Sequence, residues 1–159
     1  MQSQSTAAGT VLEYLSFRLG AEEYGVDILQ VQELRAYTAV TAMANAPAHV
    51  KGVIHLRGVI VPIIDLRIKL NLPNPAYDQF TVVVIVVVAG AQIGVVVDSV
   101  SEVLALLPEQ VKPVPQMSAA SYADYVTGIG TLEQRMLILV DIARLVAGDA
   151  DLGPDALAA

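Results

Sequence analysis

The amino-acid sequence predicts an all-β protein in which two small barrels pack on each other across an apolar seam. The first observation behind this prediction is a series of short apolar runs, rich in Val and Ile, that Gly-containing turns separate. Such a series is typical of barrel strands and differs from the alternation of strands and helices in a parallel sheet. The second observation is that the series occurs twice. Because units of about 60 residues are only marginally stable alone, we expect the two units to bury a shared face.

The repeat is clearest between residues 52–70 and residues 128–146, which align without a gap. "GVIHLRGVIVPIIDLRIKL" lies over "GIGTLEQRMLILVDIARLV". Each copy begins with Gly and continues as a strand, a turn and a longer strand that ends at Asp. A short segment with apolar residues at helical spacing follows. The chain therefore divides into units at roughly residues 11–70 and 80–146, joined by the turn-rich "NLPNPAYDQ".

The segments that precede these copies also match each other. "LGAEEYGVDILQVQEL" resembles "AGAQIGVVVDSVSEVL" once one residue is dropped from the first turn and one is added after it, and the alignment then places Val31 over Val100 and Glu33 over Glu102. Within "DILQVQELRAY", apolar residues recur at spacings of three. This spacing predicts a short helix or turn that leaves Glu33 and Arg35 toward solvent.

One uncharged segment, "FTVVVIVVVAGAQIGVVV", is about long enough to cross a bilayer as a helix. Its β-branched residues favour strands instead, and its glycines interrupt the run where a hairpin would turn. We therefore predict two buried strands, Thr81–Ala89 and Ile93–Val97, and no insertion into a membrane. The chain ends, residues 1–10 and 147–159, are rich in small and polar residues and are predicted to be a flexible arm and a flexible tail.

Composition excludes several classes of function. The chain has no cysteine, which excludes disulfides, thiolate metal sites and cysteine nucleophiles. Sixteen acidic residues against nine basic ones give a net charge of -7, which would repel a phosphate backbone and makes nucleic acid an improbable partner. A hydrophobic content of 55% supports a sizeable core.

No residue pattern nominates an active site or a cofactor. The chain contains no GxSxG elbow, no GxxxxGK loop and no GxGxxG that opens a helix. His49 and His55 have no third ligand at a fitting spacing, so we predict no metal site. Asp65 and Asp141 occupy equivalent places before possible helical turns. We interpret them as N-caps rather than as a catalytic pair, and we predict that the protein is not an enzyme.

Arg57 is the residue that the repeat explains least. Where the first unit has Arg57-Gly58, the second has Glu133-Gln134, so the fold tolerates different residues at this predicted turn. Two interpretations follow from the residues alone. Arg57 is either a solvated turn charge or a guanidinium presented to a carboxylate or backbone group of a partner.

Four segments together resemble one known family. "EEYGVDILQVQELRAY", "KGVIHLRGVIVPIIDLRIKL", "GVVVDSVSEVL" and "MLILVDI" are similar to the CheW family of bacterial chemotaxis coupling proteins, from about Leu12 to Val146. Without flanking kinase or response-regulator segments, the chain resembles the stand-alone adaptor rather than the related regulatory domain of the kinase CheA. The resemblance implies a single domain at residues 11–146, with two five-stranded SH3-like β-barrels around a shared apolar core and short helical segments.

The resemblance also implies a function and its residues. The expected protein is a non-enzymatic cytoplasmic adaptor, a monomer alone, that joins membrane-associated arrays and links the cytoplasmic hairpin tips of chemoreceptors to the regulatory domain of CheA. The arginine of the family's "LRG" motif falls on Arg57 and the glutamate of its "VQE" motif on Glu33, both expected on partner-binding surface with Val31 close by. Val103 matches a position near these surfaces. Gly52 does so too, but its repetition as Gly128 suits a backbone role.

Two other functions stay open as alternatives. The same fold can serve as the adaptor of a related chemosensory pathway, such as pilus motility. A small-molecule-binding barrel with its cleft between the two units is the competing class, and it would require a strongly perturbed Asp or His in that cleft.

Overall fold

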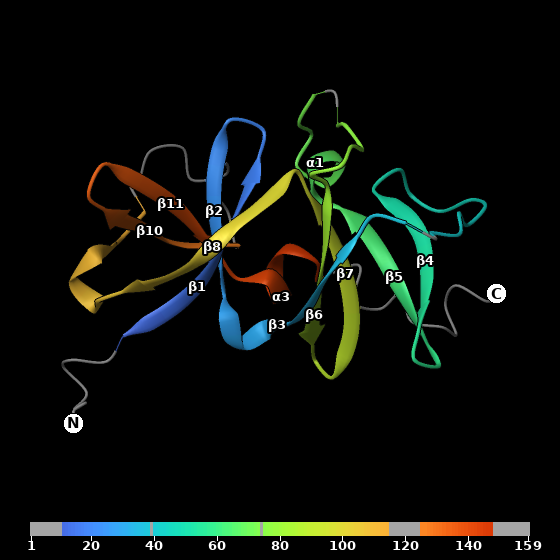
Figure 1. Ribbon diagram of the computed structural model, residues 1–159, viewed down its shortest axis with the longest axis horizontal. Coiled ribbons are helices and arrows are strands. Elements are labelled where there is room, and N and C mark those ends of the chain that lie inside the picture. Colours follow the sequence, from blue (N-terminus) through green and yellow to red (C-terminus); the bar gives the residue numbers. More distant parts are fainter. Residues whose placement is uncertain (1–10, 39, 74, 115–124, 148–159) are drawn as a thin grey trace.

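A computed structural model describes residues 11–38, 40–73, 75–114 and 125–147 (Figure 1). One sheet contains β1 (Leu12–Leu19), β2 (Glu22–Asp27), β8 (Ser99–Leu106), β9 (Val111–Lys112), β10 (Val126–Leu132) and β11 (Arg135–Val140). The other contains β3 (Val31–Ala36), β4 (Val50–Leu56), β5 (Val59–Asp65), β6 (Val82–Val88) and β7 (Ala91–Val97). Among the described residues, the helical segments are short: the 3₁₀ turns η2 (Ile28–Gln30) and η3 (Pro108–Gln110), and the α-helices α1 (Leu66–Lys69) and α3 (Ile142–Leu145).

This architecture confirms the all-β prediction. The strand order is β8-β1-β2-β11-β10-β9 in the six-stranded sheet and β3-β6-β7-β5-β4 in the five-stranded sheet. The expected count of five strands therefore holds for one sheet, and the short β9 belongs to a sheet of six. The uncharged segment at residues 80–97 forms the predicted hairpin, with β6 and β7 on either side of the turn at Ala89-Gly90. In the described part of the chain, no helix has the length and apolar character to span a bilayer.

The two repeat units do not each form a barrel, which corrects the sequence-based expectation. The first unit gives β1 and β2 to the six-stranded sheet and β3 to β5 to the other, and the second unit gives β6 and β7 in return. Parallel pairs, β11 with β2 and β5 with β7, join strands of different units. A repeat specifies the order of similar strands, but it does not specify whether a strand edge pairs within its own unit or with the other unit.

A further difference concerns the segment predicted as a short helix or turn. Only Ile28–Gln30 is helical, and the chain continues as strand β3. The spacing of three arises because β3 contains a bulge: Val31 pairs with Val86 and Glu33 pairs with the next residue, Ile85. One extra residue in a strand changes which side chains share a face.

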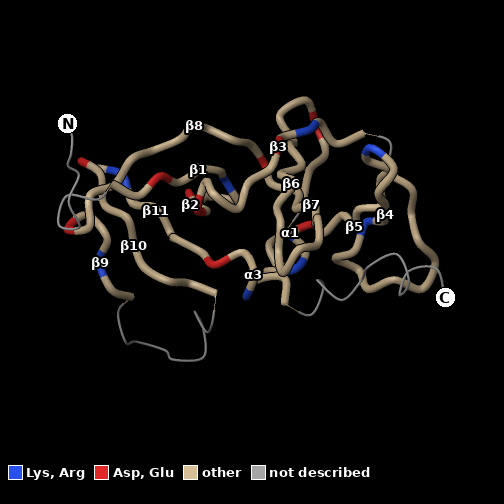
Figure 2. The backbone as a smooth tube through the Cα atoms, turned by 90° about the horizontal axis from the view of Figure 1, so that it is seen from below, with Lys and Arg blue, Asp and Glu red and all other residues tan. Residues whose placement is uncertain are grey.

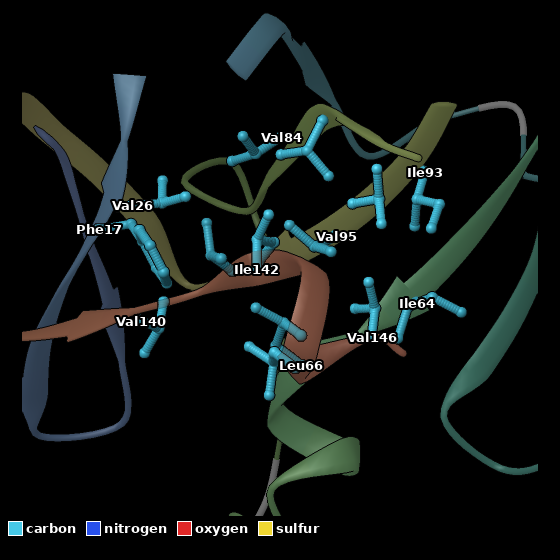
Figure 3. Packing of buried hydrophobic residues seen from close by; sticks show 14 of the residues in the cluster. Phe17, Val26, Ile64, Leu66, Val84, Ile93, Val95, Val140, Ile142 and Val146 are labelled. Carbon is cyan, nitrogen blue, oxygen red and sulfur yellow. The ribbon is translucent and has the colours of Figure 1, made fainter. Parts of the chain in front are cut away.

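An apolar core shared by both sheets confirms the predicted seam. Figure 3 shows side chains from both sheets packed around α3. The members of this shared core include Phe17, Val26, Ile64, Leu66, Val84, Ile93, Val95, Val140, Ile142 and Val146. Each sheet also has an inner cluster of its own. The inner cluster of the five-stranded sheet is Ile54, Leu56, Val61, Ile63, Val83, Ile85 and Val96. That of the six-stranded sheet is Leu104, Leu106, Leu137 and Leu139.

Both predicted N-caps are confirmed. The Asp65 carboxylate accepts the backbone N–H of Arg67 at 2.9 Å, and the Asp141 carboxylate accepts that of Ala143 at 3.0 Å. Asp65 does more than cap a helix, because it is fully buried and forms an ion pair with the buried Arg67 guanidinium at 2.7 Å. The hydroxyl of Tyr77, in the segment between the two repeat units, donates to the same carboxylate. This hydrogen bond connects that segment to the N-terminus of α1.

The Arg67 guanidinium also connects the two sheets. It pairs with Asp98, which follows β7, and Asp98 in turn accepts the backbone N–H of Gly20 at 2.7 Å. Gly20 lies in the turn between β1 and β2, whereas Arg67 follows β5. A chain of charge-assisted hydrogen bonds therefore joins a turn of one sheet to a helix at the end of the other.

Candidate functional site

Arg57 lies at the tip of the β4–β5 hairpin, in the two-residue turn that the sequence predicts. Leu56 pairs with Val59, and the two residues between them have positive φ angles, +48° at Arg57 and +84° at Gly58. Positive φ at both central positions is the geometry of a type I′ turn, which follows the natural twist of a hairpin and favours Gly. His55, the residue that precedes this end of the strand, is exposed.

The Arg57 guanidinium is paired within the chain. Its Nη2 donates to Oε1 of Glu33 on β3, and Nη1 of Arg35 lies 3.2 Å from the other carboxylate oxygen of Glu33. The Arg57 side chain still keeps 59% of its surface exposed. The bond from Arg57 lowers the pKa of the Glu33 carboxyl below its ordinary value, so Glu33 is ionised at neutral pH. We call Glu33, Arg35 and Arg57 the arginine-rich cluster.

This cluster spans the two edges of the five-stranded sheet. Strand β3 is one edge and β4 is the other, yet Glu33 and the β4–β5 hairpin meet. A second contact joins the segment that follows β3 to strand β4, because Thr41 and Val53 exchange two backbone hydrogen bonds of 2.9 Å. The position of Arg57 is thus fixed by the way the two edges approach each other.

The bulge in β3 turns Val31 and Glu33 to opposite faces of the sheet. Val86, the partner of Val31, belongs to the shared core, and Val31 itself packs against that core. Ile85, the partner of Glu33, belongs to the inner cluster. Directly paired residues in an antiparallel ladder share a face. Val31 is therefore near Glu33 in sequence but belongs to a different surface.

Val103 lies on the other sheet, in the edge strand β8. It pairs with Leu15 of the shared core, and 49% of its surface is exposed. A register shift in β8 between the pairs made by Val100 and Val103 resembles the bulge in β3. The four predicted residues accordingly fall into two groups. Glu33 and Arg57 meet at one end of the five-stranded sheet, while Val31 and Val103 lie on the faces that pack toward the shared core.

A second Arg–Glu cluster, which sequence reasoning missed, occupies the equivalent end of the six-stranded sheet. Nη1 of Arg135 lies 2.8 Å from Oε2 of Glu102, and Nε of the same guanidinium donates to Glu23 at 3.4 Å. The hydroxyl of Ser16 donates to Glu23 as well. The bond from Arg135 lowers the pKa of the Glu23 carboxyl. The alignment of Glu33 with Glu102 was the signal that could have located this cluster.

An open cavity of about 330 Å³ bears on the small-molecule alternative. It is lined by Tyr14, Asp27, Gln30, Thr127, Val140 and Asp141. Its two carboxylates already serve the backbone, because Asp27 accepts the N–H of Leu29 at 2.9 Å and Asp141 caps α3. Burial and the nearby Asp27 raise the pKa of the Tyr14 hydroxyl. Among the described residues, no group of three His, Asp or Glu side chains is arranged to hold a metal ion.

Comparison with known proteins gives a consistent result. The family described as CheW-like domain matches residues 13–150. The chemotaxis protein CheW of Klebsiella aerogenes is 51% identical over 137 residues, which cover 86% of this chain and 82% of that protein. The probable chemotaxis protein CheW of Rhizobium etli is 35% identical over 84% of this chain and 86% of its own length. The crystal structure of the scaffolding protein TtCheW from Thermoanaerobacter tengcongensis superposes with a TM-score of 0.79 at 28% identity, covering 86% of this chain and 92% of that one.

Proposed function

Because this chain belongs to the CheW-like domain family, we propose that it is a non-enzymatic adaptor that couples chemoreceptors to the histidine kinase CheA. In this proposal the protein acts in the cytoplasm and joins receptor arrays at the membrane. It binds the cytoplasmic hairpin tips of the receptors with one surface and the regulatory domain of CheA with another. Ligand occupancy at the receptors would then control autophosphorylation of the kinase.

The observation that best supports this proposal is the separation of the candidate contact residues onto two surfaces. Val31 packs against the shared core and the exposed Val103 pairs with the core residue Leu15, on strands that are both sheet edges. Apolar side chains on such edges suit the apolar face of a helical hairpin. Glu33 and Arg57 lie at the far end of the five-stranded sheet, where their charges suit a polar protein surface. An adaptor has to hold two partners at once, and two separate surfaces allow this.

The pairing of Arg57 with Glu33 determines which hydrogen-bond donors of the guanidinium are available to a partner. A guanidinium has five N–H donors, and the bond to Glu33 occupies only part of this capacity. The exposed donors remain oriented by an anchored side chain, which reduces the conformational entropy lost on binding. Individual contacts of this kind are weak, and repetition in an array raises their effective concentration.

The deciding experiment measures CheA autophosphorylation in receptor-containing membranes, with and without this protein. We expect wild-type protein to stimulate the kinase. Arg57→Ala should weaken binding of the CheA regulatory domain about tenfold, with receptor binding retained. Val103→Asp should weaken binding of the receptor and leave binding of the CheA regulatory domain unchanged. Arg144→Ala, which removes another exposed arginine on α3, is the matched control and should behave as wild type.

Two results would contradict the proposal. Well-folded wild-type protein that neither binds nor stimulates its matched partners would reject receptor–kinase coupling. Arg57→Ala and Val103→Asp that bind both partners as wild type would reject the assignment of the two surfaces.

A further inference from the structure

The buried ion pair of Asp65 and Arg67 is not repeated in the second unit of the chain. In the alignment of the two units, Asp141 takes the place of Asp65 and Ala143 takes the place of Arg67. Both units nevertheless build the same local structure, because each Asp side chain accepts a backbone N–H of the short helix after its strand and caps that helix. This local structure therefore does not depend on a buried arginine. What Arg67 contributes has to lie in its contacts with other parts of the chain.

Asp98 is the residue at which the chain crosses from one sheet to the other. Strand β7 belongs to the five-stranded sheet, β8 belongs to the six-stranded sheet, and Asp98 alone lies between them. Its backbone N–H donates to the carbonyl oxygen of Arg18 at 3.0 Å, and its carboxylate accepts the N–H of Gly20 at 2.7 Å. The other oxygen of this carboxylate pairs with Arg67 on α1, and α1 lies near the boundary of the two sheets (Figure 2). The crossing is thus attached to both sheets.

Tyr77 covers the ion pair from the outside. A local turn positions this residue, because the hydroxyl of the buried Thr81, just before β6, accepts the backbone N–H of Asp78 at 2.9 Å. The ring centre of Tyr77 lies 4.9 Å from Cζ of Arg67, and its hydroxyl donates to the Asp65 carboxylate. Tyr77 is 40% exposed, whereas Asp65 and Arg67 are almost completely buried. The segment between the repeat units therefore contributes a side chain that shields the ion pair from solvent.

These side chains are connected in series, and one guanidinium is shared by two carboxylates. Burial and the bond to Asp65 raise the pKa of the Tyr77 hydroxyl, so the hydroxyl is protonated and donates at neutral pH. Nε of Arg67 lies 2.7 Å from the Asp65 carboxylate, while Nη1 pairs with Asp98. A buried carboxylate that loses one donor attracts its remaining donors more strongly, because its low-dielectric surroundings compensate the charge poorly. Loss of the Tyr77 bond would therefore draw the guanidinium toward Asp65 and away from Asp98.

We propose that Tyr77, Asp65, Arg67 and Asp98 form a relay that couples the segment between the repeat units to the β1–β2 turn on the other sheet. While the Tyr77 hydroxyl is bound, the guanidinium holds Asp98, and Asp98 holds the turn. When the hydroxyl leaves, the guanidinium shifts toward Asp65 and the turn opens more often. The relay thus makes the junction between the two sheets depend on the position of a mostly exposed segment. This inference goes beyond the proposed adaptor function, and the free protein is enough to test it.

Amide hydrogen exchange of the free protein, measured by nuclear magnetic resonance, tests the relay. Tyr77→Phe removes the hydroxyl, keeps the ring and leaves the charge unchanged. We expect the Gly20 and Asp98 amides to exchange about tenfold faster, which corresponds to the loss of one hydrogen bond. The amide of Val26, buried in β2, should change less than about twofold. Tyr14→Phe is the matched control: it removes a tyrosine hydroxyl from β1, the strand that leads to Gly20, and should leave both reporter amides within about twofold of wild type.

A second route from this segment to the turn has to be separated from the relay. Cδ1 of Leu72 lies 3.7 Å from the place that a Cβ at Gly20 would occupy, so direct packing is another means of transmission. Asp98→Asn breaks the relay, because an amide has a single oxygen and cannot accept from Arg67 and Gly20 with separate oxygens. In that background, Tyr77→Phe should have no further effect on the Gly20 amide. In a Leu72→Ala background, Tyr77→Phe should keep its full effect.

Three results would overturn the inference. Unchanged exchange at Gly20 in Tyr77→Phe would show that the two ends are not coupled. Equal acceleration of all amides, with a lowered midpoint of thermal unfolding, would show a general loss of stability instead of a relay. Acceleration that persists in Asp98→Asn and disappears in Leu72→Ala would assign the coupling to packing. If Asp98→Asn does not fold, the Leu72→Ala background alone separates the two routes.

Discussion

At the scale of single residues, the buried Arg67 is held by several partners at once. Only 2% of it is exposed, and it pairs with Asp65 and Asp98 while its Cζ lies 4.9 Å from the ring centre of Tyr77. The sequence could predict Asp65 as a helix cap because the Asp precedes apolar residues at helical spacing. It could not predict the burial of Arg67, since arginine near a short helix is usually solvated.

Arg67→Met should strongly destabilise the fold. Removing one partner of a buried ion pair leaves the other charge without compensation, which costs about 3–5 kcal/mol. Arg18→Met removes an exposed arginine instead and should change the free energy of unfolding by less than about 1 kcal/mol. Urea unfolding followed by circular dichroism measures both. Equal stability of the two variants would contradict the structural role given to Arg67.

The stabilisation from Asp65 should depend on pH. Burial alone would raise the pKa of its carboxyl, but the hydrogen bonds from Arg67 and Tyr77 outweigh burial and lower it. The folded-state pKa is thus below the unfolded value of about 3.9. The stabilisation is then complete above that value and lost as the pH falls through the folded-state pKa. The stability difference between wild type and Asp65→Asn should be large at pH 6 and shrink in acid. A pH-independent difference would contradict this.

At the scale of the elements, small irregularities decide which residues share a surface. The type I′ turn at Arg57-Gly58 and the β6–β7 hairpin could be predicted, because Gly between β-branched runs is a strong local signal. The bulges in β3 and β8 could not, because a one-residue insertion leaves no mark in composition and its spacing imitates a helix. Val31 and Glu33 were therefore expected side by side, whereas they lie on opposite faces.

Two glycines in the same hairpin should respond differently to substitution. Gly52 has φ +143°, and a Cβ there would lie 2.0 Å from the carbonyl oxygen of Thr41. Gly58 has φ +84°, but a Cβ would meet nothing within 4 Å. Gly58→Ala should cost about 1–2 kcal/mol of backbone strain. Gly52→Ala should cost more than about 4 kcal/mol, because backbone atoms must move. Chemical unfolding tests this order, and a reversed order would refute it.

At the scale of the whole molecule, the two repeat units are interlocked. The repeat itself and the shared core were predictable from the positions of Gly, Asp and apolar runs. The exchange of strands was not, because β1 and β6 resemble each other as strands whichever sheet they enter. Each sheet contains strands from both units, so we expect neither unit to be a stable domain by itself.

Fragments cut between the units test this interlocking. Residues 11–78 lack β6 and β7 for the five-stranded sheet, and residues 79–147 lack β1 and β2 for the other. We expect each fragment alone to give an unfolded amide spectrum by nuclear magnetic resonance, and an equimolar mixture to regain the dispersed spectrum of the intact chain. Dispersed signals from either fragment alone would show that one unit folds independently.

The exchange of strands also sets the order in which the protein is completed during its synthesis. All strands of the five-stranded sheet have been translated once Val97 is added. In the other sheet, β2 has to wait for β11, and Tyr24 and its partner Ile138 are 114 positions apart in the chain. Strand β1 likewise has to wait for β8, so the β1–β2 pair presents apolar side chains and two unpaired strand edges until β8 emerges from the ribosome, and one unpaired edge until β11 follows. The nascent chain is therefore most exposed to misassociation after β1 and β2 have been translated and before the later strands of the six-stranded sheet follow.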